Sequence, residues 1–381
     1  MPSNAGERSP ILQTDPKAGY LAARAAIDAA IRRVLEGGTY ILGAEVEAFE
    51  RAFAAFIGAA HAVGTASGTD ALVLALRALD LAPDDYVVTV AHTAIATVAA
   101  IELAGARPLL VDIDPATMTL DAGALADALA APPGRVAAVV PVHLYGQAAD
   151  LDAILALARR HGLRVVEDCA QSHGALLHGR RLGSFGDVAA FSFYPTKNLG
   201  AFGDAGMVVT DNAALAGRVA ALRQYGWGEH RISATVGMNS RLDALQAAIL
   251  GVKLDRLDDD NARRAAIAAI YDAGLAAAGL VLPARRPDAA HVFHQYVVRH
   301  GRRDALRAAL GRRLVGTGIH YPVPVHRQPA YRDRLALGPV GLGASERAAA
   351  EVLSLPIYPQ LGAAAAHRVV AAVKDALPEI G

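Results

Sequence analysis

The sequence predicts an α/β fold: a mostly parallel seven-stranded sheet lying between helices in a large domain, followed by a small C-terminal α+β domain. The chain has 381 residues, too many for one ordinary core and suited to two domains. Between about residues 60 and 210, short apolar runs alternate with stretches of helical spacing, which is typical of a parallel sheet covered on both faces. Because 53% of residues are hydrophobic and only 19% are charged, we also expect extensive burial between elements or between subunits.

Seven apolar runs are the expected strands, and the segments between them are the expected helices. These segments place Leu, Ile, Val and Ala at helical intervals, and Gly105 and Gly162 stand where left-handed helix ends are common. The expected strands are 61–65, 85–90, 107–113, 136–142, 163–168, 188–193 and 206–210.

A long helical pattern from about 239 to 282 is polar enough to run over the surface between two bodies. We expect a long helix around 240–275 to link a large domain, residues 1–250 with the N-terminal segment, to a small domain, residues 251–381. The small domain alternates strands and helices in a different rhythm.

Composition excludes several classes of function. Lys plus Arg and Asp plus Glu number 37 each, so no single-sign charge favours nucleic acid or an anionic membrane. No stretch has the sustained hydrophobicity of a membrane span. The single cysteine, Cys169, excludes a disulfide framework and fits a reducing compartment. The first ten residues lack an export signal, so we expect a cytoplasmic protein. His291 and His294 have no third ligand at a suitable spacing, and no metal site is expected.

The first candidate site follows the strand at 61–65, where a helix opens near Gly68 and Thr69. Ligands of open α/β sheets bind at the carboxyl ends of strands, and the free N–H groups of a helix start attract anions. Small residues there would let a phosphate come close. The alternative is an ordinary turn with Ser67 as the helix N-cap.

The second candidate is Asp168, which with Glu167 ends a mostly apolar strand. A carboxylate at the end of a buried strand is costly unless a cation or hydrogen-bond donors meet it, and a protonated ring nitrogen would do so. The alternative is an Asp that caps a helix.

The third candidate is Lys197, in a Gly-rich turn that follows a strand and contains Ser192. An amine that points into a cleft has a lowered pKa and becomes a nucleophile, whereas a lone lysine is usually solvated. Together, an anion cradle, a strand-end Asp and a strand-end Lys are what pyridoxal 5'-phosphate (PLP) requires. Asn239 precedes a further helix, and for this residue the sequence alone favours the ordinary role of a helix start.

Many segments in order resemble the sugar aminotransferases of the DegT/DnrJ/StrS type, which share the aspartate-aminotransferase fold (PLP-dependent transferase fold type I). They are GGTYILGAEVEAFE, SGTDAL, AHTAIAT, PVHLYGQ, EDCAQSHGA, FSFYPTKNLGAFGDAG, GMNSRLDALQAAIL and IHYPVPVHRQPAY. The resemblance implies that Lys197 forms the Schiff base, Asp168 faces the ring nitrogen and Gln171 contacts the ring-oxygen side. It also implies a phosphate held by Gly68, Thr69 and Ser192, with Asn239 reaching it from the neighbouring subunit of a homodimer with shared active sites.

The resemblance further implies transfer of an amino group from L-glutamate to a keto-sugar nucleotide, most closely a dTDP-linked 3-keto-6-deoxyhexose. C-4 keto sugars, ketocyclitols and a non-catalytic regulatory role stay as alternatives. Lys197 stands where dehydratase relatives carry His, which favours transamination. A dinucleotide-binding oxidoreductase is disfavoured because GTASGTD, not GxGxxG, follows the first strand.

One position departs from the family pattern. Relatives usually place an aromatic ring against the cofactor face where this chain has Ala94, so either His92 or another side chain covers that face, or the stacking is weaker. Loop residues that resemble positions lining the sugar-nucleotide cleft, with packing as the alternative, are Tyr40, Tyr225, Trp227, Tyr321 and His326.

Overall fold

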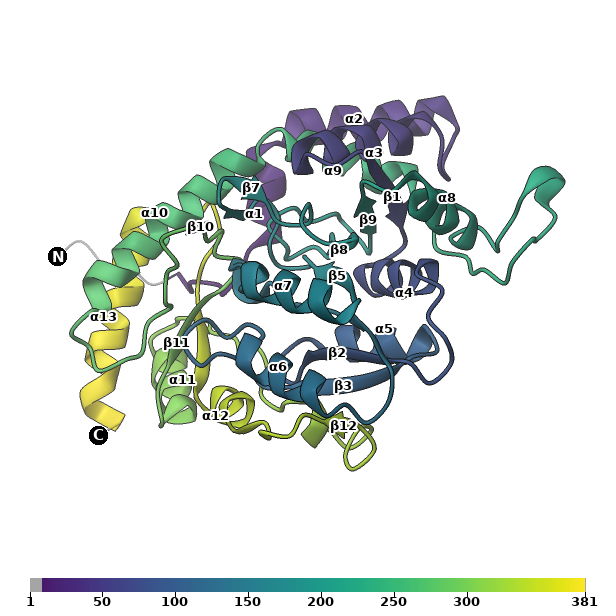
Figure 1. Ribbon diagram of the computed structural model, residues 1–381. Helices are drawn as coiled ribbons and strands as arrows, with labels where there is room; N and C mark the ends of the chain where they lie inside the picture. The colour runs from purple at the N-terminus through teal and green to yellow at the C-terminus, as the bar shows by residue number, and fades with distance from the viewer. Residues whose placement is uncertain (1–8, 381) are drawn as a thin grey trace.

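A computed structural model describes residues 9–380 and shows one large sheet between layers of helices (Figure 1). Residues 1–8, most of the segment in which no export signal is expected, lie outside the described residues. In spatial order, the sheet consists of β1 (His61–Thr65), β9 (Gly206–Thr210), β8 (Val188–Ser192), β5 (Arg164–Asp168), β4 (Val136–Val139), β2 (Tyr86–Val90), β3 (Arg107–Val111) and β12 (Ala336–Leu337).

All seven predicted strands form within the predicted runs. Five of the neighbouring pairs are parallel, and only β9 runs antiparallel, against both β1 and β8. The eighth strand, β12, has two residues and pairs with β3 from far along the chain. Because β1, β2, β5 and β8 point the same way, their carboxyl ends meet at one edge of the sheet.

The apolar side chains of the strands alternate between two helical layers, as the pleat of a sheet requires. Val166 and Val188 pack with α4 (Gly68–Ala78), α5 (Ile95–Leu103) and α8 (Ala213–Leu222). Val165 packs on the other face with α6 (Ala122–Ala130) and α7 (Leu151–His161). On that second face, α3 (Ala44–Ile57) covers Ala189 and Phe191.

The prediction of a single long helix around 240–275 is wrong. The structure has α9 (Ala244–Leu254) and α10 (Leu257–Leu275), separated by a turn at 255–256. Each half packs on a different partner: α9 on α2 (Arg24–Gly37) and α3, and α10 on α13 (Gly362–Ile380). The break lets one continuous apolar pattern serve two packing surfaces.

The C-terminal region has an apolar cluster of its own, built on α10, α13, α11 (Arg303–Arg312) and the antiparallel pair β11 (Tyr296–Arg299) and β13 (Val352–Leu355). Ile11 belongs to this cluster and bridges to Val315. The N-terminal segment, assigned to the large domain, therefore contacts the C-terminal region, and a division at residue 250 stays a prediction.

Shorter elements complete the described chain, and none of its helices is long and apolar enough to cross a membrane. The remaining helices are α1 (Pro16–Ala22), α12 (Gly343–Glu351) and the 3-10 turns η1 (Leu144–Gly146), η2 (Glu229–Arg231) and η3 (Val325–Arg327). The remaining strands are β6 (Leu176–Leu177), β7 (Arg180–Arg181) and β10 (Ala289–Ala290), which form a small sheet.

Candidate active site

The start of α4 lies directly against the end of β8, at the edge where the strand ends meet. A Cβ added to Gly68 would lie 2.4 Å from the Cβ of Ser192, so only glycine permits this approach. Ser67 caps α4 by accepting from Asp70 N at 3.1 Å. Among the described residues, the N–H groups of Gly68 and Thr69 have no partner, as expected of a first helical turn. The two interpretations of this turn are therefore compatible: Ser67 is the N-cap of α4, and free N–H donors remain beside Ser192.

Asp168 ends β5 and is 4% exposed. Its Oδ1 accepts from Ala170 N at 3.1 Å, and its Oδ2 accepts from the hydroxyl of Thr97 at 2.9 Å. Burial raises the pKa of the carboxyl group, while these donors and the amine of Lys197 oppose that rise. No cation lies within ion-pair distance of it among residues 9–380, so Asp168 is a buried carboxylate without a positively charged partner in the described chain.

Lys197 follows β8 in a tight turn closed by its own N–H, which donates to Tyr194 O at 2.8 Å. Burial lowers the pKa of the amine to about 8, and Asp168 raises it in part. The amine and the carboxylate are therefore close enough to influence each other. Sequence reasoning expected the two groups to converge, and the structure brings them to one edge of the sheet.

Gln171 lies beside Asp168 and is held at both ends. Its Oε1 accepts from Tyr145 N at 2.8 Å, and its Nε2 donates to the hydroxyl of Tyr321 at 3.1 Å. The Tyr145 hydroxyl in turn donates to the carbonyl of His320. Residues 320–321, from the C-terminal region, thereby close one side of the site.

His92 follows β2 and is 1% exposed. Its Nε2 lies 2.7 Å from the Tyr145 hydroxyl, and burial lowers the pKa of the imidazole to about 4. Because the Tyr145 hydroxyl proton goes to His320, the neutral His92 donates through Nε2, and its buried Nδ1 has no partner among the described residues. Ala94 is the N-cap residue of α5 and makes no side-chain hydrogen bond. That His92 or another side chain covers the cofactor face in place of the family's aromatic ring stays a prediction.

The residues expected at the sugar-nucleotide cleft do not gather at one place within this chain, and their role in a cleft stays a prediction. Tyr321 alone joins the cluster around Asp168. Tyr40 is exposed and its hydroxyl donates to Leu35 O, while Tyr225 is exposed and packs near Trp227. His326 is buried and pairs with Glu346 at 2.9 Å.

Asn239 is exposed at the base of an arm, residues 225–237, that extends beyond α8 (Figure 1). Its neighbour Ser240 contacts the start of α4, accepting from Ala66 N and donating to Asp70. The structure gives Asn239 no side-chain hydrogen bond within its own described chain. Its role at the phosphate stays a prediction.

Sequence reasoning missed three residues of the cluster: Thr97, Tyr145 and His320. All three lie in the motifs that carry the family resemblance, and Thr97 and Tyr145 would otherwise be taken for packing residues of a helix or turn. The signal that could have found Thr97 and Tyr145 is position, because they follow predicted strands by seven and three residues.

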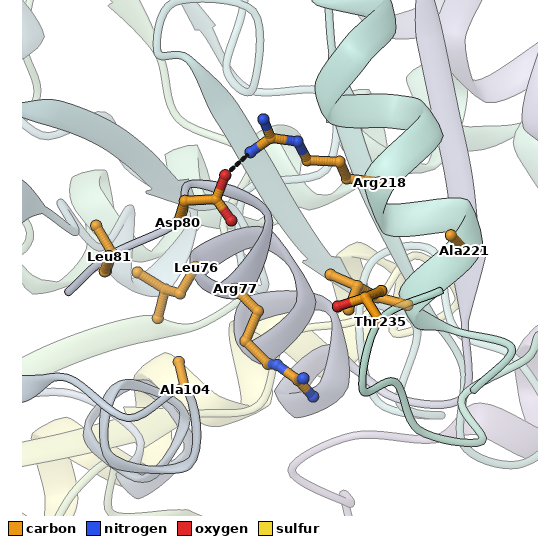
Figure 2. Close-up of a pocket in the computed structure, with 9 residues that line it drawn as sticks. Leu76, Arg77, Asp80, Leu81, Ala104, Arg218, Ala221 and Thr235 are labelled. Carbon is orange, nitrogen blue, oxygen red and sulfur yellow. Dashed lines mark hydrogen bonds and ion pairs between the residues drawn. The ribbon is translucent and has the colours of Figure 1, made fainter. Parts of the chain in front are cut away.

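A surface pocket that shares no residue with this cluster lies between α4, α8 and the end of α5 (Figure 2). Arg218 pairs with Asp80, and Arg77 donates to Val236 O. The arginines are already partnered, and none of the described residues lining the pocket is a lysine, cysteine or histidine. This pocket therefore offers no lysine, cysteine or histidine for chemistry, in contrast to the sheet edge with Lys197.

A scan against family models matches residues 22–374 to the DegT/DnrJ/EryC1/StrS aminotransferase family. The chain belongs to this family. It is an aminotransferase, and the family uses PLP. The resemblance seen in the sequence is thereby confirmed, together with the fold class.

Individual relatives agree over nearly the whole chain. The dTDP-3-amino-3,4,6-trideoxy-α-D-glucose transaminase of Streptomyces venezuelae is 49% identical, covering 95% of this chain and 94% of its own. The erythromycin biosynthesis sensory transduction protein EryC1 of Saccharopolyspora erythraea is 48% identical, covering 94% and 98%. The crystal structure of S. venezuelae DesV with a ketimine intermediate superposes with a TM-score of 0.92, at 49% identity, covering 96% and 98%.

The residues of this aminotransferase fit PLP on structural grounds. Gly68 leaves free N–H donors against Ser192 where a Cβ would block them. Asp168 is buried without a cationic partner, which suits a protonated ring nitrogen, and Lys197 has an amine of lowered pKa. An anion cradle, a carboxylate and a nucleophile thus stand at one edge.

Proposed function

We propose that this aminotransferase moves an amino group from L-glutamate to a dTDP-linked 3-keto-6-deoxyhexose. The convergence of Lys197 and Asp168 beside the Gly68–Ser192 contact carries the proposal as to chemistry. The relative of 49% identity, named for a dTDP-3-amino sugar, supports the sugar. We further propose that the enzyme works in the cytoplasm, where its one thiol, Cys169, would stay reduced.

In this proposal the bound PLP supplies an electron sink, and the residues of the chain bind, orient and move protons. The N–H groups of Gly68 and Thr69 and the hydroxyl of Ser192 hold the phosphate. Asp168 keeps the ring nitrogen protonated. Lys197, with a pKa of about 8, is partly neutral near neutral pH. Its amine would accept the proton from the α-carbon of the amino donor and deliver it to the cofactor within the same half-reaction, and in the second half it would move a proton the opposite way, onto the acceptor carbon.

We also propose a homodimer with shared active sites. The arm 225–237 carries exposed apolar side chains, with Ile232 68% and Val236 79% exposed, and Figure 1 shows it standing away from the rest of the chain. A second copy that covers the arm would bring Asn239 towards a neighbouring phosphate site. A monomeric mass in light scattering would contradict this proposal.

The test is a screen of acceptors against the pyridoxamine-loaded enzyme. Keto-sugar nucleotides and ketocyclitols are added one at a time, and return of the visible absorbance of the Lys197-bound cofactor reports amino transfer. The expected result is the fastest return with dTDP-3-keto-6-deoxyhexoses. A faster return with a C-4 ketone or a ketocyclitol would overturn the choice of sugar.

The regulatory alternative has its own outcome in this screen. It predicts a cofactor bound at Lys197 but no transfer to any acceptor. The Lys197→Ala variant is the matched control, because it should bind pyridoxamine phosphate and never restore the absorbance.

A further inference from the structure

Thr97 holds one oxygen of the Asp168 carboxylate. Thr97 is the third residue of α5, is 1% exposed, and donates from Oγ1 to Asp168 Oδ2 at 2.9 Å. The hydroxyl of Thr93, four residues earlier and just before α5, lies 2.9 Å from Thr97 Oγ1. Since Thr97 has one hydroxyl proton and gives it to the carboxylate, Thr93 must be the donor in the second contact. The result is a directional chain from Thr93 through Thr97 to Asp168.

This arrangement differs from the usual behaviour of threonine in a helix. Such a hydroxyl commonly bonds a carbonyl of the preceding turn, which satisfies it locally. Thr97 instead bonds a carboxylate 71 residues away, on the strand end that faces the cofactor site. A hydroxyl that accepts a hydrogen bond becomes a stronger donor, so Thr93 strengthens the hydrogen bond from Thr97 to Asp168.

Asp168 depends on this donor. Its other oxygen accepts only from Ala170 N, at 3.1 Å, and burial works against the ionised form. Removing the Thr97 hydroxyl would leave the carboxylate with one donor and a freer rotamer. Both changes would weaken its hold on a ring proton.

We propose that Thr97 is a positioning residue that fixes Asp168 and keeps it ionised, and so sets the protonation of the cofactor ring, with Thr93 as its supporting donor. The proposal rests on the proposed placement of Asp168 at the ring nitrogen. Thr97 would act through Asp168 and would not touch the substrate.

The test is Thr97→Val, which keeps the shape and removes the hydroxyl. In the holoenzyme we expect the pH titration of the visible cofactor band to move upward by roughly one pH unit, because less positive charge stays on the ring. We expect kcat to fall roughly tenfold or more, with KM for the amino donor little changed. Thr97→Ser should restore both values, and Thr93→Val should shift the band in the same direction by less.

Thr89→Val is the matched control. Thr89 is also fully buried, but its hydroxyl donates to Val140 O within the sheet, so this variant should lose stability and keep the parent titration. A parent titration in Thr97→Val, or an equal shift in Thr89→Val, would overturn the proposal. Should Thr97→Val fail to fold, the Thr93→Val titration decides.

Asp168→Asn separates this proposal from the proposed function. If it moves the titration and the Thr97 and Thr93 variants do not, only the role of Thr97 fails. If Asp168→Asn itself leaves the titration at the parent value, Asp168 does not face the ring, and the proposed function fails with it.

Discussion

Two neighbouring carboxylates at the end of β5, Glu167 and Asp168, are both buried and are treated in opposite ways by the fold. Glu167 is fully buried and its two oxygens accept four hydrogen bonds. Asp168 has two donors, Thr97 and Ala170. The donors to Glu167 are His143 Nε2 at 3.1 Å, Gly183 N at 2.9 Å, and the N–H groups of Phe185 and Gly186, each at 2.8 Å.

The pKa values follow from this difference. Burial raises the pKa of Glu167, but the hydrogen bonds from His143 and the backbone outweigh it, so the net shift is downward. For Asp168 burial wins, and the pKa is raised. His143 accepts from Ala149 N at Nδ1, which leaves its proton on Nε2 for Glu167. Glu167 is therefore a saturated structural anion, whereas Asp168 keeps capacity for a cationic ligand.

The largest effect that this comparison predicts is on turnover in Asp168→Asn. The variant keeps the shape of the side chain but cannot balance a protonated ring, so kcat should fall more than a hundredfold. The circular dichroism spectrum should match the parent. A parent rate of amino transfer by the purified variant would show that Asp168 is not the partner of the ring.

Glu167→Gln should behave in the reverse manner. An amide places an N–H₂ group against backbone donors, so unfolding by urea should show a loss of about 3 kcal/mol. The folded fraction should turn over within about threefold of the parent, a mild effect on the rate scale. A large loss of kcat at parent stability would contradict the structural role assigned to Glu167.

Much of the sheet could be predicted from the sequence because each strand is an apolar run bounded by turn residues. The positions of Gly68, Asp168, Ser192 and Lys197 at one edge follow from that topology. The two-residue strand β12 could not be predicted, since its pairing with β3 depends on tertiary position rather than on propensity.

Contacts between distant segments were the part that sequence could not supply. Three contacts join residues that no local sequence pattern relates. They are the hydrogen bond from Thr97 to Asp168, the pairing of His326 with Glu346, and the β-bridge between Ile11 and Val315. The break between α9 and α10 could not be predicted either, because it too depends on contacts between distant segments. The residues on either side are good helix formers, and only their separate packing partners reveal the break.

The smallest predicted effect is on the pH dependence of apoprotein stability, where the two carboxylates should have opposite signs. Glu167 has a lowered folded pKa, so its contribution is present above its ordinary value of 4.5 and is lost as pH falls through the folded pKa. Asp168 has a raised folded pKa, so its contribution is present below 3.8 and is lost as pH rises through the folded pKa.

Urea unfolding of the apoprotein at a series of pH values measures both signs. The stability gap between parent and Glu167→Gln should narrow as the pH falls below about 4.5, whereas Asp168→Asn should gain on the parent as the pH rises above 3.8. Parallel curves for the two variants would mean that the fold treats the two carboxylates alike. In that case the unsatisfied capacity of Asp168, on which its assignment to a cationic ligand depends, would be absent.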